Sequence, residues 1–138
     1  MMDILIKNAA IVTVNKEREV FFDGAIAIKD DKIAAVGNTK DILREYSDAK
    51  KVIDAEGKVI FPGFINTHNH LFQTLLKGLG DDMVLKDWLA TMTFPAAKFI
   101  TREDTYYAAM QGCIEGLRSG ITTMVDYMYP HNRENLCD

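Results

Sequence analysis

Two histidines separated by a single residue, His68 and His70, are the side chains whose type and spacing point to chemistry. They close a short apolar segment that follows the break at Pro62-Gly63 and that reads as a strand. Because successive side chains on a strand point to opposite faces, both imidazoles would share a face with Asn66, while Asn69 would point away. Two neutral imidazoles at one strand end form half of a site for Zn²⁺, Fe²⁺ or a similar cation. The alternative is a solvent-facing strand end, because His-x-His is a short motif with many chance matches.

The segments that follow the histidines predict helices and then a second strand. A strand, helices and a strand form a βαβ unit, in which the two strands pair in parallel through a right-handed crossover. The predicted elements are helices over residues 71–79 and 83–92, an interruption at Pro95, a helix with Thr101 as N-cap and Asp104 in its first turn that ends at Ser119-Gly120, and a strand over residues 121–128.

The first 60 residues have the pattern of a small, mostly β unit. Runs rich in β-branched residues alternate with turn signals, which is typical of short strands. The predicted elements are one or two strands over residues 3–14, a hairpin of residues 25–29 and 32–36, a short helix over residues 39–46 capped by Asn38 or Thr39, and a second hairpin of residues 52–55 and 58–61 around Glu56-Gly57.

Composition narrows the class of protein. A hydrophobic content of 48% with 26% charged residues is ordinary for a soluble globular domain. The net charge of −4 and the scattered basic residues argue against nucleic acid as a partner, and no apolar run is long enough for a membrane span. The two cysteines form no disulfide framework and the N-terminus has no signal-peptide pattern, so we expect a cytoplasmic protein. We expect Cys113, which lies in a helical pattern, to be buried, and Cys137, which lies next to the C-terminus, to be exposed.

Residues 62–82, followed by Trp88-Leu89, closely resemble the metal-dependent amidohydrolases. The most similar branch holds S-adenosylhomocysteine and methylthioadenosine deaminases, guanine-type deaminases and triazine chlorohydrolases. Residues 120–126 resemble the second barrel strand of this family, and residues 54–63 resemble its approach to the first. Asn66 favours this branch, because the dinuclear hydantoinase and dihydroorotase relatives usually carry an aspartate at that position.

The resemblance implies an α/β fold in two parts. Residues 1–61 would be the N-terminal part of a small β-sandwich, and residues 62–138 would be the first βαβ unit of a (β/α)₈ barrel. Such a barrel takes roughly 250 residues, so we expect it to be incomplete in this chain. Active-site groups of these barrels lie at the C-terminal ends of the strands, which is where His68 and His70 fall.

The resemblance also implies a chemistry. One divalent ion, zinc or alternatively iron, would be held by His68, His70, a later histidine and a final aspartate, and its hydroxide would attack a ring carbon that bears an amino or chloro group. Gln73 matches a position that contacts the substrate ring in related deaminases, although it could simply cap a helix. Trp88 resembles an aromatic residue that lines the substrate pocket, although it could simply anchor an amphipathic helix.

This chain departs from the family pattern in one large respect. The later histidine, the proton-carrying glutamate and the final aspartate have no counterpart, and the remaining histidine, His131, matches no ligand position. We therefore expect no catalytic residue in this chain and no activity from it alone. The main hypothesis is the N-terminal portion of an aminohydrolase that acts on a small heterocycle; the alternative is a non-catalytic, oligomerising module that binds metal incidentally.

Either hypothesis predicts association. The chain would pair with the missing remainder of the enzyme or form a homo-oligomer, because a βαβ unit leaves strand edges uncovered. We expect the exposed apolar strand residues that drive this association to be Ile121, Met124 and Met128.

Overall fold

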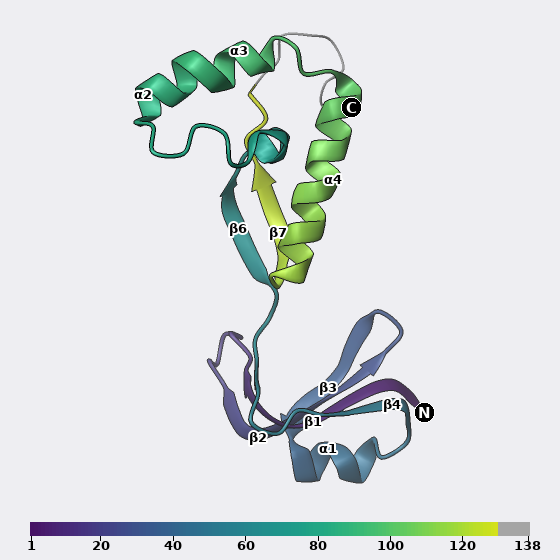
Figure 1. The fold of residues 1–138 in the computed structure, drawn as a ribbon. Helices are drawn as coiled ribbons and strands as arrows, with labels where there is room; N and C mark the ends of the chain where they lie inside the picture. Colours follow the sequence, from purple (N-terminus) through teal and green to yellow (C-terminus); the bar gives the residue numbers. More distant parts are fainter. Residues whose placement is uncertain (130–138) are drawn as a thin grey trace. The chain divides into compact units, whose positions relative to one another are not determined.

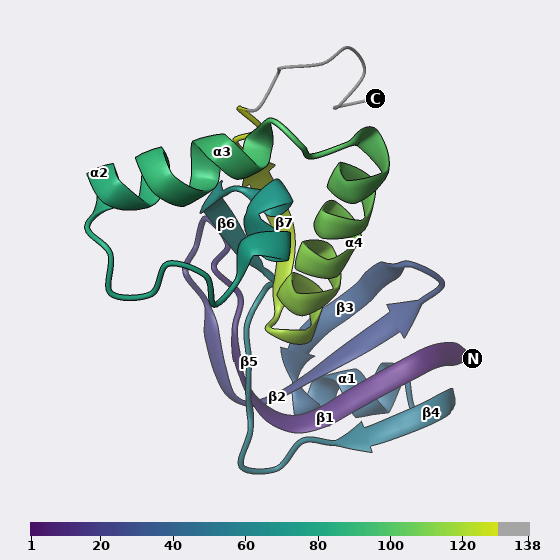
Figure 2. The same cartoon turned by 45° about the horizontal axis from the view of Figure 1, so that its top comes forward.

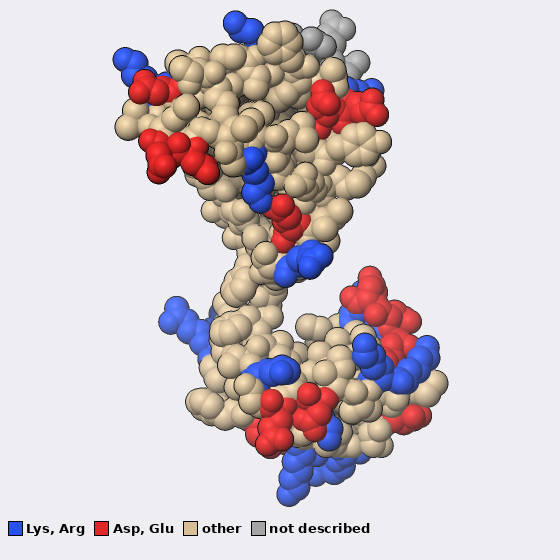
Figure 3. Space-filling view, in the orientation of Figure 1, with Lys and Arg blue, Asp and Glu red and all other residues tan. Residues whose placement is uncertain are grey.

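The computed structural model describes residues 1–129, and the chain divides into two compact units, Met1–Pro62 and Gly63–Asp138 (Figure 1). The first unit is mostly β and the second is a mixture of helices and two strands, so the expected mixed α/β class is confirmed. In the face shown by Figure 3, acidic and basic side chains are interspersed over both units. Among the described residues, no helix is long and apolar enough to cross a membrane.

The first unit is a five-stranded sheet with one helix packed on it. The strand order is β3-β2-β1-β4, and β5 also pairs with β1. Leu5, Ala25, Ala27 and Ile42 form one buried cluster under the helix. The elements are β1 (Met2–Val12), β2 (Val20–Lys29), β3 (Lys32–Asn38), α1 (Thr39–Glu45), β4 (Ala49–Asp54) and β5 (Val59–Ile60).

The two predicted hairpins have different outcomes. β2 and β3 pair antiparallel around a turn in which Asp30 has a positive φ of 54°, as predicted. The prediction of a second hairpin, of residues 52–55 and 58–61, is wrong. β4 and β5 both run parallel to β1 and do not pair with each other. Gly57, with φ of 73°, lies in a turn between β4 and β5 that does not reverse the direction of the chain. Hydrogen bonds to β1 continue on both sides of this turn. The Ala55 N–H donates to Lys7 O before it, and the Ala10 N–H donates to Lys58 O after it.

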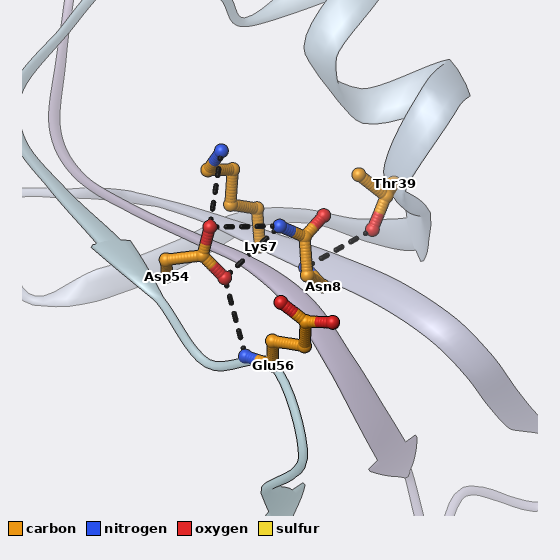
Figure 4. A network of polar contacts seen from close by, with 5 residues as sticks. All are labelled: Lys7, Asn8, Thr39, Asp54 and Glu56. Carbon is orange, nitrogen blue, oxygen red and sulfur yellow. Dashed lines mark hydrogen bonds and ion pairs between the residues drawn. The ribbon is translucent and has the colours of Figure 1, made fainter.

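A polar network fastens β1 to β4 and α1 (Figure 4). Asn8 lies at an irregularity of β1 with φ of 62°, a conformation that asparagine tolerates better than most residues. Its side-chain nitrogen donates to both oxygens of Asp54 at 2.9 and 3.0 Å, and its backbone N–H donates to the Thr39 hydroxyl at 3.2 Å. Asp54 also accepts from the Glu56 N–H and pairs with Lys7 at 3.3 Å.

The second unit is a βαβ unit whose two strands, β6 and β7, pair in parallel (Figure 2). The helical part between them is more irregular than predicted, because it begins with a 3₁₀-helix and contains a π-helical turn. α4 lies along β7 and also packs on the 3₁₀-helix η1. The elements are β6 (Phe64–Asn69), η1 (Leu71–Leu76), α2 (Leu85–Trp88), the π-helix η2 (Leu89–Thr93), α3 (Phe94–Ala97), α4 (Arg102–Arg118) and β7 (Ile121–Asp126).

Pro95 does not interrupt the second helical stretch as predicted. It lies in the first turn of α3, directly after the π-helix η2. Proline is tolerated in the first turn of a helix, and the wider π turn before it changes the hydrogen-bond register at which a proline would otherwise break the helix. Residues 85–97 therefore continue through Pro95 as one run of helical elements.

The boundaries of α4 agree with the prediction, but the burial of Cys113 does not. Thr101 and Asp104 form a reciprocal capping box, and Gly120 follows the end of the helix with φ of 83°. The buried residues are small ones, Thr105, Ala108, Gly112 and Gly116. Cys113 is exposed, which corrects the prediction that it is buried. Small residues bring the helix so close to its neighbours that a Cβ on Gly112 would meet Leu71.

The prediction of which apolar strand residues are exposed is also wrong. Ile121, Met124 and Met128 are partly buried. Ile121 and Met124 lie against α4, where a Cβ on Gly116 would meet both of them. The apolar strand side chains that do face solvent in this unit are instead Phe64, Ile65 and Val125, with 57%, 65% and 43% of their surfaces exposed.

Candidate metal and substrate site

The two histidines lie where β6 ends, and their rings approach each other. The ring centroids of His68 and His70 are 5.2 Å apart with an interplanar angle of 88°. His68 lies near the end of strand β6, whose last residue is Asn69, and His70 is the residue between the strand and η1. The geometry is that of two imidazoles that can approach one ion from one strand end.

A backbone carbonyl of the neighbouring strand segment orients His70. Its Nδ1 lies 2.8 Å from the carbonyl oxygen of Tyr127. Since a carbonyl can only accept, Nδ1 carries a proton in this contact, and in the neutral ring the lone pair is then on Nε2. Metal-binding histidines in proteins are commonly oriented by such a bond from their second ring nitrogen.

The ends of the two parallel strands are tied together around the histidines. The carboxylate of Asp126 accepts from the Leu71 N–H at 2.8 Å, so it caps the first turn of η1. Asn69 accepts from the His70 N–H through its side chain at 2.9 Å and from the Tyr127 N–H through its backbone oxygen at 2.8 Å. These bonds fix the backbone on both sides of His70.

A cavity of about 520 Å³ brings the predicted site residues together. His68, His70, Gln73 and Trp88 all line it, although they come from β6, η1 and α2. Gly80 allows the loop before α2 to pass over the indole, because a Cβ there would lie 2.6 Å from Trp88 Cδ1, and its φ is 78°.

An ion pair closes part of the cavity wall. Lys77 Nζ lies 2.6 Å from Glu115 Oε2, which joins the segment after η1 to α4. This contact lowers the pKa of the Glu115 carboxyl, chiefly through the hydrogen bond from Lys77. Both residues line the cavity, and both are too exposed for the pair to contribute much to folding.

Two tyrosines beside the histidines were not identified from the sequence. The Tyr127 ring lies 5.8 Å from His68 and 6.0 Å from His70 between centroids. Tyr129 lies 5.2 Å from His70, and its hydroxyl accepts a hydrogen bond from Gln73 Nε2 at 2.5 Å. Burial raises the pKa of the Tyr129 phenol, and the bond from Gln73 offsets this only in part. The available signal was topological, because parallel strands bring their C-terminal ends to the same edge of a sheet.

A third metal ligand is missing from the part of the chain that the structure describes. Within residues 1–129, no three His, Cys, Asp or Glu side chains lie close enough together to hold an ion. His131 and Cys137 lie outside the described residues. Among the described residues, the candidate ligands are thus two imidazoles, one at the end of β6 and one just beyond it.

Known proteins resemble this chain over nearly all of its length. Residues 59–137 match the amidohydrolase family. A 5-methylthioadenosine/S-adenosylhomocysteine deaminase of Acetivibrio thermocellus is 38% identical over 133 residues, which are 96% of this chain and 30% of that protein.

Solved structures give the same picture. An adenosine deaminase of Xanthomonas campestris with bound zinc superposes with a TM-score of 0.81 at 29% identity, over 93% of this chain and 29% of that one. A mutant of the atrazine chlorohydrolase TrzN from Arthrobacter aurescens, complexed with zinc and atraton, gives 0.76 at 26% identity, over 91% and 29%.

This chain belongs to the amidohydrolase family, as its resemblance to that family implied. It spans about 30% of the length of the curated relatives that it matches.

Proposed function

We propose that this chain is the N-terminal portion of a metal-dependent aminohydrolase that hydrolytically deaminates or dechlorinates a nitrogen heterocycle. The observation that carries this proposal is the arrangement at the end of β6: His68 and His70 converge, and they line the same cavity as Gln73 and Trp88. The cavity therefore contains two side chains of a kind that bind metals and two side chains suited to binding a flat, polar ring.

The residues present fit a divalent metal as part of its ligand set. His68 and His70 would hold the ion, and the bond from His70 Nδ1 to Tyr127 O leaves Nε2 of the neutral ring as the nitrogen available to it. When bound, Zn²⁺ or Fe²⁺ would lower the pKa of a water molecule and so supply the nucleophile. Further ligands and the groups that carry protons would come from outside the described residues.

We assign Gln73 and Trp88 to substrate binding. An indole offers a flat apolar surface to a heterocycle, and a primary amide can both donate and accept hydrogen bonds at its edge. The comparisons support this substrate class through a relative named for methylthioadenosine and S-adenosylhomocysteine and a neighbour solved with the triazine atraton.

We also propose a place for each unit in the longer architecture. Residues 62–138 would begin a (β/α)₈ barrel, and residues 1–61 would form part of a β-sandwich. The support is that β6 and β7 are parallel with helices between them, while among the described residues β6 has a partner on one edge only.

The experiment is an assay of the protein at its natural length, loaded with zinc or iron. S-adenosylhomocysteine, 5′-methylthioadenosine, adenosine, guanine and atrazine would be supplied, and the release of ammonia or chloride would be measured. We expect metal-dependent release from at least one of these compounds, and removal by a chelator should abolish it. Turnover that persists after the metal is removed would refute the proposal.

The alternative, a non-catalytic oligomerising module, has one observation in its favour. Phe64, Ile65 and Val125 expose apolar surface on the small sheet, and Ile114 and Leu117 do so on α4. Such surface drives association when nothing covers it. Sedimentation of the natural-length protein distinguishes the two: a stable homo-oligomer without turnover of any test compound would favour the module.

A further inference from the structure

Tyr129 contacts three residues of the segment that follows β6. Its hydroxyl accepts from Gln73 Nε2 at 2.5 Å, and its ring packs perpendicular to His70 and to Phe72, at centroid distances of 5.2 and 4.9 Å. Phe72 is fully buried, so the tyrosine ring packs against a side chain of the protein interior. These contacts hold one side of the ring, while 37% of the surface of Tyr129 is exposed.

The hydrogen bond constrains Gln73, which otherwise has a flexible side chain. Gln73 is half-buried on η1 and lines the cavity. One N–H of its amide is used by Tyr129, while within residues 1–129 its Oε1 has no hydrogen-bond donor. While the Tyr129 hydroxyl accepts from Nε2, the amide leaves Oε1 as the acceptor toward a ligand; in the opposite amide orientation the hydroxyl would donate to Oε1 and an N–H would be left instead.

We propose that Tyr129 is a positioning residue that holds the Gln73 amide for ligand binding, and that the ligand offers an N–H to Gln73 Oε1. This inference rests on the proposed function only for the identity of the ligand as a nitrogen heterocycle. Tyr129 acts through Gln73 and not on the reacting atoms. The ring N–H groups and exocyclic amines of such heterocycles are the matching donors.

The first test needs no ligand. In protein at natural length labelled with ¹⁵N-glutamine, the side-chain amide signal of Gln73 is identified by its loss in Gln73→Ala. Tyr129→Phe keeps the ring and removes the oxygen, so we expect the Gln73 amide proton signals to move toward those of a free glutamine. Tyr107→Phe on the exposed side of α4 is the matched control and should leave them in place. An unmoved Gln73 signal in Tyr129→Phe would overturn the inference.

The second test is a double-mutant cycle on turnover of S-adenosylhomocysteine, or of whichever compound of the panel proves to be the substrate. Tyr129→Phe should raise KM about fivefold with little change in kcat, which is the size expected for one hydrogen bond. In a Gln73→Ala background the same change should have no further effect, because its action passes through Gln73. Additive effects on KM would overturn the positioning role.

The two tests separate the possible failures. If no panel compound is turned over, the proposed function fails, and the NMR measurement still decides whether Tyr129 holds Gln73. If the signal moves and KM does not, the glutamine is held but does not select the ligand, and that result would refute the assignment of Gln73 Oε1 to a ligand N–H.

Discussion

At the scale of single residues, the proposed chemistry of this chain depends on two imidazoles and on the bond that orients one of them. His70 is fixed by Tyr127 O, whereas His68 has no hydrogen-bond partner for its ring within residues 1–129. An unfixed imidazole loses more freedom when it binds a metal, so the two histidines are not equivalent. Both are nevertheless required by the proposal, because neither strand supplies another ligand.

We predict that His68→Ala and His70→Ala each reduce the zinc content of the natural-length protein from near stoichiometric to background. The reason is that a catalytic zinc site holds few protein ligands, and each substitution removes one. Metal analysis after dialysis measures the effect. Gln73→Ala is the control and should keep its zinc. A protein that retains full zinc without both imidazoles would show that the metal is held elsewhere.

The Asn8 network gives a second residue-scale prediction, which concerns stability. The pKa of the Asp54 carboxyl is lowered, first by the hydrogen bonds from the Asn8 side chain and next by the Glu56 N–H. A carboxyl with a lowered pKa in the folded state stabilises the fold above the ordinary aspartate range, and this contribution is lost as the pH falls through the folded-state value. We therefore expect stability to decrease on acidification below about pH 4, where unfolded aspartates take up protons.

Urea unfolding between pH 7 and pH 3 measures this effect. Asn8→Gly keeps the positive φ and removes the side chain, so the contribution of Asp54 to the loss of stability in acid should become smaller. Asp31→Asn, in the turn between β2 and β3, removes a carboxylate without a hydrogen bond or ion pair among the described residues, and it should leave the pH dependence nearly unchanged. An Asn8→Gly profile parallel to that of the original protein would contradict the network's role.

At the scale of elements, α4 is a 17-residue helix whose start is defined by local hydrogen bonds. Its capping box consists of the Asp104 N–H bonded to Thr101 Oγ1 at 3.2 Å and the Thr101 N–H bonded to Asp104 Oδ2 at 2.9 Å. These local bonds explain why the helix boundaries were predictable from the sequence. The buried face was not, because it depends on which neighbours the helix meets.

We predict that Thr101→Ala lowers the free energy of unfolding by about 1 kcal/mol, the usual cost of losing an N-cap side chain. Thermal or urea unfolding measures the change. Thr101→Ser retains the hydroxyl and is the matched control, so most of the stability should remain. If Ser and Ala were equally destabilising, the methyl group of Thr101 would be the important part and not its hydrogen bonds.

The irregular elements show where local sequence rules fail. Residues 71–76 have apolar spacing suited to an α-helix, yet they form the 3₁₀-helix η1, whose Thr74 hydroxyl bonds to the backbone oxygen of Ala108 at 2.6 Å. A contact to α4, more than thirty positions away, is invisible to a pattern that is read locally. The contact between Thr74 and α4 is thus found together with the tighter, 3₁₀-helical turn of η1.

At the scale of the whole molecule, the proposed metal site has only two ligands among the described residues, which bears on what this chain can do alone. Two imidazoles from one strand leave a metal with an open and weakly held ligand set. We predict that the purified 138-residue chain shows no metal-dependent turnover of the test compounds, even with excess zinc. The same assays on the natural-length protein are the positive control. Zinc-dependent turnover by the short chain would show that its own residues suffice.

Local chemistry in the sequence determined much of this protein. The His68-x-His70 spacing, the cap at Thr101 and the turn at Gly120 each depend on neighbours a few residues away, and the family followed from motifs that are contiguous in the chain. Only the tertiary structure decided which contacts cross the chain: β5 beside β1, Asp126 on Leu71, and Tyr129 on Gln73. Those contacts join segments about 50 residues apart, and strand pairing and packing set them, which residue types alone do not encode.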